Sequence, residues 1–297
     1  MASGLSQSDK VRIASDFIQH SPPGQIQKVI EDVQVLLGKG ALDSRTLSGI
    51  VERANRDSFL CVCVPPSGER VLLTPEGELS DGHFLDPTGK QQLVIDHVSQ
   101  QCTGVKALPS KLRAACAAAD GPRESVDAAM REYAAETLPE AVVTTYGKKT
   151  DGNLLRVTSC VSTCKMSLSN YWAGLWRSTW TLEMSVGGST GRLSGKVACN
   201  VHYFEDGNVQ LLDSTTFEAD VSLGDDIGKA FQRAVAEQER AFIAAMEEVF
   251  LTMSETVLNA LRRRLPITKT KFDWENAAGM SGRNNLAKGL ANQKSSS

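Results

Sequence analysis

Apolar residues near the N-terminus recur at the three- and four-residue spacing of an α-helix. The stretch SQSDKVRIASDFIQH places its apolar positions in one helical stripe, and Ser8 or Asp9 is positioned to cap it. A second stripe runs through residues 26–37 and ends at Gly38, a residue suited to a helix C-terminus. A third, weaker stripe over residues 43–56 completes a predicted group of three short helices.

Short β-prone runs replace the helical pattern between residues 59 and 98. The runs FLCVCV, RVLLT and QQLVIDHV are separated by PPSGE, PEGELSDG and DPTGK, whose Pro, Gly and Asp residues are typical of tight turns. We expect a small β-rich globule here. A further helix is expected over residues 122–138, because Pro122 suits a first helical turn.

Five successive segments then show the composition and alternation of β-strands. Their connections KKTDGN, GGSTG and EDG are short and rich in turn-forming residues, so consecutive strands are expected to pair antiparallel in a meander. Such a sheet exposes one face to water and needs its other face covered. The predicted strands span residues 141–147, 154–166, 171–186, 192–204 and 208–221.

A long amphipathic helix is predicted directly after the last strand. From Asp225 to Leu265 the apolar residues form a single stripe, and about forty helical residues extend roughly 60 Å. This helix would cover the sheet, and its length exceeds what one small domain needs. The pattern therefore predicts an α+β fold, with a central antiparallel sheet covered by a long C-terminal helix, and a partner subunit.

Charge is divided unevenly along the 297-residue chain. The net charge of the whole chain is −3, whereas residues 259–297 hold eight Lys or Arg against two acids, a net of +6 that leaves the preceding residues at −9. An acidic body with a basic C-terminal segment indicates that this segment meets an anionic surface. The overall composition, 41% hydrophobic and 23% charged, is that of an ordinary globular protein.

The seven cysteines form no CxxC pair and have no histidine at metal-ligand spacing, which predicts reduced thiols. Cys160 and Cys164 fall in a predicted strand, where residues four apart are separated by about 13 Å and make a poor zinc pair. The N-terminal residues lack the apolar core of a signal peptide, and no transmembrane run of apolar residues occurs. We expect a cytoplasmic protein.

No segment carries the signature of an active site. YGKKTDG contains letters of a phosphate-binding loop but lies between two predicted strands, and VGGSTGRLSG is likewise interpreted as a β-turn. The four histidines are scattered, and none belongs to a metalloprotease or nucleophile-elbow motif. We therefore predict that the protein is not an enzyme and has no catalytic residue, no cofactor and no metal site.

The stretch CNVHYFEDGNVQLLDST, residues 199–215, brings His202, Glu205 and Asp206 close together. Side chains alternate on both sides of Asp206 and Gly207, and this pair is the usual centre of a tight hairpin. A calcium-binding loop would need more acidic ligands at alternating positions. The stretch is predicted to be a turn between two strands.

Trp172, Trp176 and Trp180 are spaced so that they share one face of a helix or a strand. This spacing predicts a role in the core or at a subunit interface. A base-stacking platform for single-stranded nucleic acid is the alternative.

The basic segment NALRRRLPITKTKFDW, residues 259–274, is the strongest candidate for function. Cations are favoured beside a helix C-terminus, which explains its first arginines, but Lys269 and Lys271 lie beyond the proline. Apolar residues interleaved with the charges favour a structured acidic protein surface as the target. A nucleic-acid patch or a nuclear-localisation signal is the alternative.

Two stretches match signatures of one known family: VHYFEDGNV at residues 201–209 and LRRRLPITKTKFDW at residues 261–274. Supporting matches occur at KVRIASDFIQHSPPG, FLDP and NYWAGLWRSTW, so that the similarity extends over roughly residues 8–275. On these motifs the chain resembles the α subunits of the heterodimeric F-actin capping proteins.

The resemblance implies a fold in four parts. They are a helical stalk over residues 1–58, a small β-rich globule over 59–115, the central sheet with its long helix over 116–258, and a basic amphipathic tentacle over 259–297. In this family the sheet continues across the α and β subunits, and each subunit lays a long helix over it. The implied function is binding to the barbed ends of actin filaments together with the β subunit, which blocks subunit addition and loss without severing.

The resemblance also implies partners and contact residues. The partners are an obligate β subunit, the filament barbed end, regulators of the CARMIL and myotrophin types, and phosphoinositides, all at the cytoplasmic cytoskeleton, with no nucleic acid. Lys269 replaces an Arg of animal α subunits, and Asn259 replaces a Lys. The implied actin-binding residues are Arg262, Arg263, Lys269, Lys271 and Trp274.

Two other functions stay open beside capping. One is a structural subunit of a dynactin-like, actin-related assembly, which differs from capping in its partner. The other is a basic-tailed nucleic-acid-binding protein, which salt-dependent binding to oligonucleotides would reveal.

Overall fold

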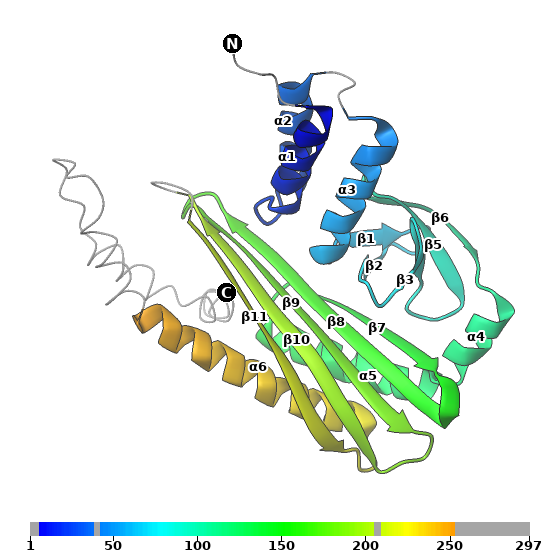
Figure 1. Cartoon of the computed structure of the whole chain (residues 1–297). Coiled ribbons are helices and arrows are strands. Elements are labelled where there is room, and N and C mark those ends of the chain that lie inside the picture. The colour runs from blue at the N-terminus through cyan, green and yellow to red at the C-terminus, as the bar shows by residue number, and fades with distance from the viewer. Residues whose placement is uncertain (1–5, 39–41, 205–208, 253–297) are drawn as a thin grey trace.

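The computed structural model describes residues 6–38, 42–204 and 209–252. Figure 1 shows three N-terminal helices at one end of the molecule, a β-rich globule beside them, and a long sheet with two helices along one face. The predicted α+β class is confirmed.

The N-terminal helices are α1 (Gln7–Gln19), α2 (Ile26–Leu37) and α3 (Ser44–Asp57). Ser6 caps α1 by accepting a hydrogen bond from the backbone N–H of Asp9 at 3.1 Å. The prediction of Ser8 or Asp9 as the cap is therefore wrong, because both already lie inside the first turn. Apolar residues of all three helices, among them Ile18, Ile30 and Val51, form a shared core, which confirms the three predicted helices.

Six short strands make up the globule. β1 (Cys61–Val64) pairs with β2 (Glu69–Leu72), and a second sheet has the order β3-β4-β5-β6. Phe84 and Leu93 are fully buried in the core of this globule, which confirms the small β-rich unit. The second sheet consists of β3 (Glu78–Ser80), β4 (His83–Leu85), β5 (Gln91–Asp96) and β6 (Gln101–Ala107).

The central sheet has five strands in the order β11-β10-β9-β8-β7, and every neighbouring pair is antiparallel. Strand order follows chain order, so the predicted meander is confirmed. A short 3-10 helix, η1 (Asp151–Asn153), lies in the first hairpin. The strands are β7 (Val142–Lys149), β8 (Leu154–Ser167), β9 (Trp172–Ser185), β10 (Thr190–Tyr203) and β11 (Val209–Ser222).

Two helices cover one face of this sheet (Figure 1). α6 (Ile227–Thr252) packs on β10 and β11, as the sequence predicts, whereas α5 (Asp120–Thr137) packs on β7 and β8 and against α6. The predicted cover by the C-terminal helix is confirmed, and the earlier helix shares the same face. A further helix before α5, α4 (Ser110–Ala117), was not predicted, since only Leu112 and Cys116 of its residues face an apolar cluster.

Two of the three tryptophans of the predicted face belong to the core beneath α5 and α6, whereas Trp172 is half-buried and lies outside that core. Trp180 is fully buried. Trp176 is 4% exposed, and the ring of Phe242 from α6 packs edge-on against it at 5.6 Å between ring centroids. Neither ring is available for stacking on a base. The core interpretation of these two residues is confirmed.

The opposite face of the sheet is not entirely open, because the globule docks on its β7 end. The backbone N–H of Leu72 donates to the Thr144 hydroxyl at 2.9 Å, and the Tyr146 hydroxyl donates to the Leu72 carbonyl at 3.1 Å. Leu72, Val142 and Cys160 form an apolar cluster there. The prediction of one wet face holds only away from this junction.

Candidate functional site

The residues predicted to bind actin lie outside the described residues. This applies to Arg262, Arg263, Lys269, Lys271 and Trp274. The structure instead describes the elements that precede this segment, above all β11 and α6. These two elements form a surface that a partner chain could bind.

The stretch 199–215 forms parts of β10 and β11, with His202 opposite Gln210 in an antiparallel register. The predicted pair of strands is confirmed, while the central residues 205–208 lie outside the described residues. Within the described chain, no three His, Cys, Asp or Glu side chains gather as metal ligands would. All seven cysteines are free thiols.

β11 forms an edge of the central sheet. The backbone N–H of Leu223 donates to the Ser189 carbonyl at 2.9 Å, which places the odd-numbered residues of β11 in hydrogen-bonded pairs with β10. The even-numbered residues, from Gln210 to Asp220, therefore direct their backbone N–H and C=O groups away from the sheet. An edge of 14 residues with this arrangement is a template for another strand.

The other edge of the sheet is less suited to pairing. β7 is 8 residues long, and α4, α5 and β2 pack against it. The longer β11 edge has no such cover among the described elements, where its neighbours are β10 and α6. A partner strand would therefore add at β11.

α6 presents an apolar row to solvent beside this edge. Ala241, Ala245 and Val249 are exposed, and their spacing of four residues places them on one face of the helix. Val249 is 51% exposed, although Phe242 and Met246 of the same helix are buried against the sheet. The apolar helix face and the open strand edge together form a surface that a partner chain could cover.

Glu239 holds α6 in place from inside the core. Its side chain is 1% exposed, and its carboxylate accepts hydrogen bonds from Trp180 Nε1 and from the Tyr133 hydroxyl, both at 2.9 Å. These partners come from β9 and α5, so one carboxylate joins the two covering helices to the sheet. Burial raises the pKa of Glu239, and the hydrogen bond from Trp180 opposes that rise.

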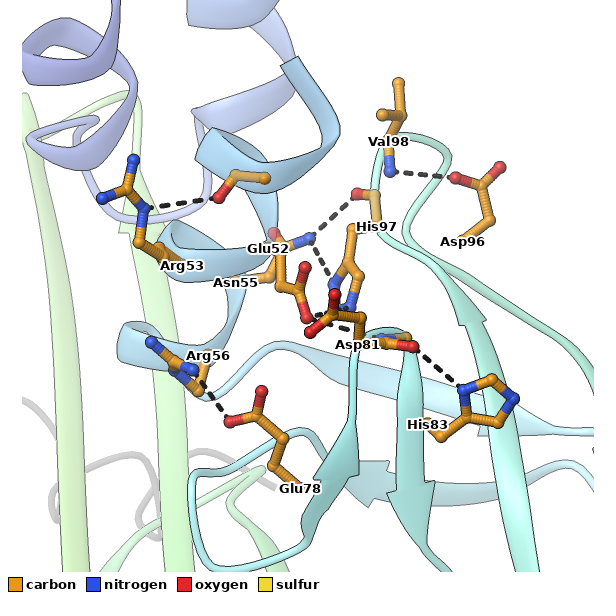
Figure 2. Close-up of polar contacts among 12 residues, drawn as sticks. Glu52, Arg53, Asn55, Arg56, Glu78, Asp81, His83, Asp96, His97 and Val98 are labelled. Atoms are coloured by element: carbon orange, nitrogen blue, oxygen red, sulfur yellow. Dashed lines mark hydrogen bonds and ion pairs between the residues drawn. The ribbon is translucent and has the colours of Figure 1, made fainter. Parts of the chain in front are cut away.

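A second polar cluster joins the helical stalk to the globule (Figure 2). Buried Asn55 on α3 donates to the His97 carbonyl at 2.9 Å and accepts from Gln100 Nε2 at 2.8 Å. Nε2 of His97 lies 3.7 Å from a carboxylate oxygen of Glu52, and burial lowers the pKa of this imidazole against the attraction of that carboxylate. The cluster fixes the orientation of α3 on the globule.

Neither polar cluster was predicted from the sequence. Glu239 occupies a position of the apolar stripe of α6, four residues after Val235 and three before Phe242, and a charge at such a position is the signal that could have found it. Asn55 and His97 come from segments far apart in sequence, so no local pattern links them.

Within the described residues, no helix combines the length and apolar character needed to cross a bilayer.

Comparison with known proteins agrees with the fold. The family model described as F-actin capping protein alpha subunit matches residues 14–284. A Dictyostelium discoideum protein named F-actin-capping protein subunit alpha is 32% identical over 285 residues, which cover 95% of this chain and 99% of that protein. The protein of the same name from Caenorhabditis elegans is 30% identical over 283 residues, 93% of this chain and 96% of its own length.

A solved structure of similar shape is that of the homodimeric actin capping protein alpha subunit from Plasmodium berghei. The TM-score is 0.64 at 18% sequence identity, and the match covers 80% of this chain and 90% of the other. At that identity the likeness supports the fold alone. The family itself is shown by the family model and by the relatives at 30% identity or more. The chain belongs to the family of F-actin capping protein alpha subunits, which are actin-binding proteins of the cytoskeleton and not enzymes.

Proposed function

We propose that this chain is the α subunit of an obligate heterodimer that binds the barbed ends of actin filaments. With its β subunit it blocks subunit addition and loss there, without severing the filament. The observation that carries the proposal is the open β11 edge beside the exposed apolar row of α6. A partner that adds a strand at β11 and lays a helix beside α6 would cover both surfaces at once.

The charge of the edge favours a different chain over a second copy of this one. β11 carries Asp213, Glu218 and Asp220 but no Lys or Arg. Arg192 of β10 forms an ion pair with Glu218 at 2.6 Å and also lies opposite Asp220, whereas Asp213 forms no ion pair with a described residue. Two copies of β11 side by side would bring like charges onto one ladder, which is unfavourable.

Actin contact belongs to the basic segment in this proposal. Residues 259–297 carry a net charge of +6 after an acidic body, so the segment can steer and orient the encounter with an acidic filament end. The stalk, globule and sheet regions predicted over residues 1–58, 59–115 and 116–258 would support it, and the protein would act in the cytoplasm at the cytoskeleton. The contact residues we propose are Arg262, Arg263, Lys269, Lys271 and Trp274.

Elongation of actin from short filament seeds tests the function directly. The co-expressed α and β subunits should stop growth at free barbed ends. Seeds whose barbed ends are already blocked serve as the control, because their pointed-end growth should continue unchanged. Undiminished barbed-end growth at micromolar heterodimer would refute the proposal.

A further inference from the structure

An open groove of about 650 Å³ lies between α1 and α3. Arg12 lines it from α1, and Arg45 and Arg53 line it from α3. Figure 2 shows Arg53 on the side of α3 that faces away from Asn55 and His97, so the groove is separate from the junction with the globule. It is also remote in sequence from the β11 edge and from the basic C-terminal segment.

The charge in the groove is strongly positive. Asp16 is the one acid among the described residues that line it, against three arginines. None of the ion pairs formed within residues 6–38, 42–204 and 209–252 uses Arg12, Arg45 or Arg53. Arg53 donates through Nε to the carbonyl of Gly49 in its own helix at 3.3 Å, which leaves its terminal nitrogens for another acceptor.

The position of Arg45 is unfavourable for the helix itself. It lies two residues after the cap Asp43, in the first turn of α3, and that turn contains no acid. The positive end of the helix dipole disfavours a cation there. Helix stability therefore does not account for an arginine at this position.

Gly49 is equally unexplained by the packing of the helices. It lies in the interior of α3, where glycine is less favourable than alanine. A Cβ atom added to Gly49 would meet no other atom within 4 Å, so no close approach of the backbone requires glycine. Because Gly49 lines the groove between Arg45 and Arg53, its missing side chain keeps the groove open there.

The spacing of the arginines indicates the shape of the ligand. Arg45 and Arg53 are eight residues apart on one helix, which separates their backbones by about 12 Å. The two guanidinium groups can therefore each bind an anionic group of their own. Carboxylates four residues apart on an extended chain are about 13 Å apart and lie on the same face, with the side chain between them directed the same way.

We propose that the groove between α1 and α3 binds an extended acidic segment of a partner protein. Two of its carboxylates would pair with Arg45 and Arg53, and an apolar side chain midway between them would lie over Gly49 and Val11. Guanidinium groups suit this role because they form charge-assisted, bidentate hydrogen bonds with carboxylates. This groove is separate from the β11 edge and from the basic segment to which we assign assembly and capping.

The test uses the co-expressed heterodimer and a fluorescein-labelled peptide with the core Glu-Ser-Leu-Ser-Glu. We expect its fluorescence anisotropy to rise with heterodimer concentration to saturation, and the same peptide with Gln for Glu not to bind. Arg53→Ala and Arg45→Ala should each weaken binding about tenfold. Gly49→Leu should weaken it at least as much, because the new side chain fills the groove while favouring the helix.

Lys28→Ala is the matched control, since Lys28 is an exposed cation of α2 outside the groove and should leave peptide binding unchanged. Barbed-end capping by all these variants should equal that of the wild type, which reports correct assembly. Equal affinity of the Arg53→Ala and Lys28→Ala proteins for the peptide would overturn the proposal. Binding of inorganic pyrophosphate without binding of the peptide would overturn it too, in favour of a phosphate site.

Discussion

At the residue scale, Glu239 ties the stability of the fold to pH. Burial raises its pKa in the folded chain above the ordinary value of 4.5, so the folded state binds the proton more tightly than the unfolded state. The charged carboxylate therefore lowers the free energy of unfolding at pH values above its pKa in the folded chain. This destabilisation disappears as the pH falls below the ordinary carboxyl pKa of 4.5. We expect Glu239→Gln to be more stable than the wild type by about 1 kcal/mol at pH 8, with the difference shrinking towards pH 4.

Urea unfolding of the heterodimer at one fixed concentration measures this difference. Glu239→Ala is the control, because it leaves the buried Trp180 and Tyr133 donors without their acceptor and should destabilise the fold by about 2 to 5 kcal/mol at every pH. A difference between the Gln variant and the wild type that does not change with pH would contradict the prediction.

Gly195 shows a second constraint on the same core. It lies opposite Trp180 in the register of β9 and β10, and a Cβ atom there would approach the indole ring to 2.1 Å. Gly195→Ala should therefore destabilise the fold by about 2 to 3 kcal/mol. Gly104→Ala in β6 is the matched control, since nothing lies within 4 Å of its added Cβ. Equal unfolding midpoints for the two variants would show that the indole does not require glycine.

At the scale of one element, the outer side of β11 can be blocked without touching its inner side. The backbone N–H of Thr216 points away from β10, so Thr216→Pro removes a donor that only a partner strand would use. We expect the yield of heterodimer from co-expression to fall at least tenfold. Thr216→Val, which keeps the N–H, should assemble normally. Normal assembly of the proline variant would argue against strand addition at this edge.

The elements also differ in how far sequence could predict them. β8 to β11 and α6 carry long, uninterrupted patterns, and the periodicity is enough to place them. α5 shows a helical pattern too, but nothing in its own residues says that it shares the sheet face with α6. Edge status depends on strand order, so β11 could be recognised as the open edge only once all five pairings were known. Glu239 and Asn55 depend on contacts between distant segments, which no local pattern contains.

At the scale of the whole molecule, the division of charge separates assembly from actin binding. Removal of residues 259–297 takes away a net charge of +6 but no described part of the sheet or of α6. The truncated chain should still form a soluble heterodimer, and its capping of barbed ends should be poor in the seeded elongation assay. Lys269→Ala or Lys271→Ala alone should weaken capping by about 1 kcal/mol or less, mainly through slower, salt-sensitive association. Full capping by the truncated heterodimer would place the actin contacts elsewhere.

The strand order of the central sheet also sets the order in which the molecule can be built on the ribosome. Each of its pairings joins neighbours in sequence, so a hairpin can close as soon as its second strand has emerged. α5 is made before β7, whereas α6 is made after β11. The part of the apolar face around Phe217 and Val221 is therefore covered only after α6 has been made. The open edge forms before α6 is made, so the surface that the proposed β subunit would cover is complete only when α6 has packed.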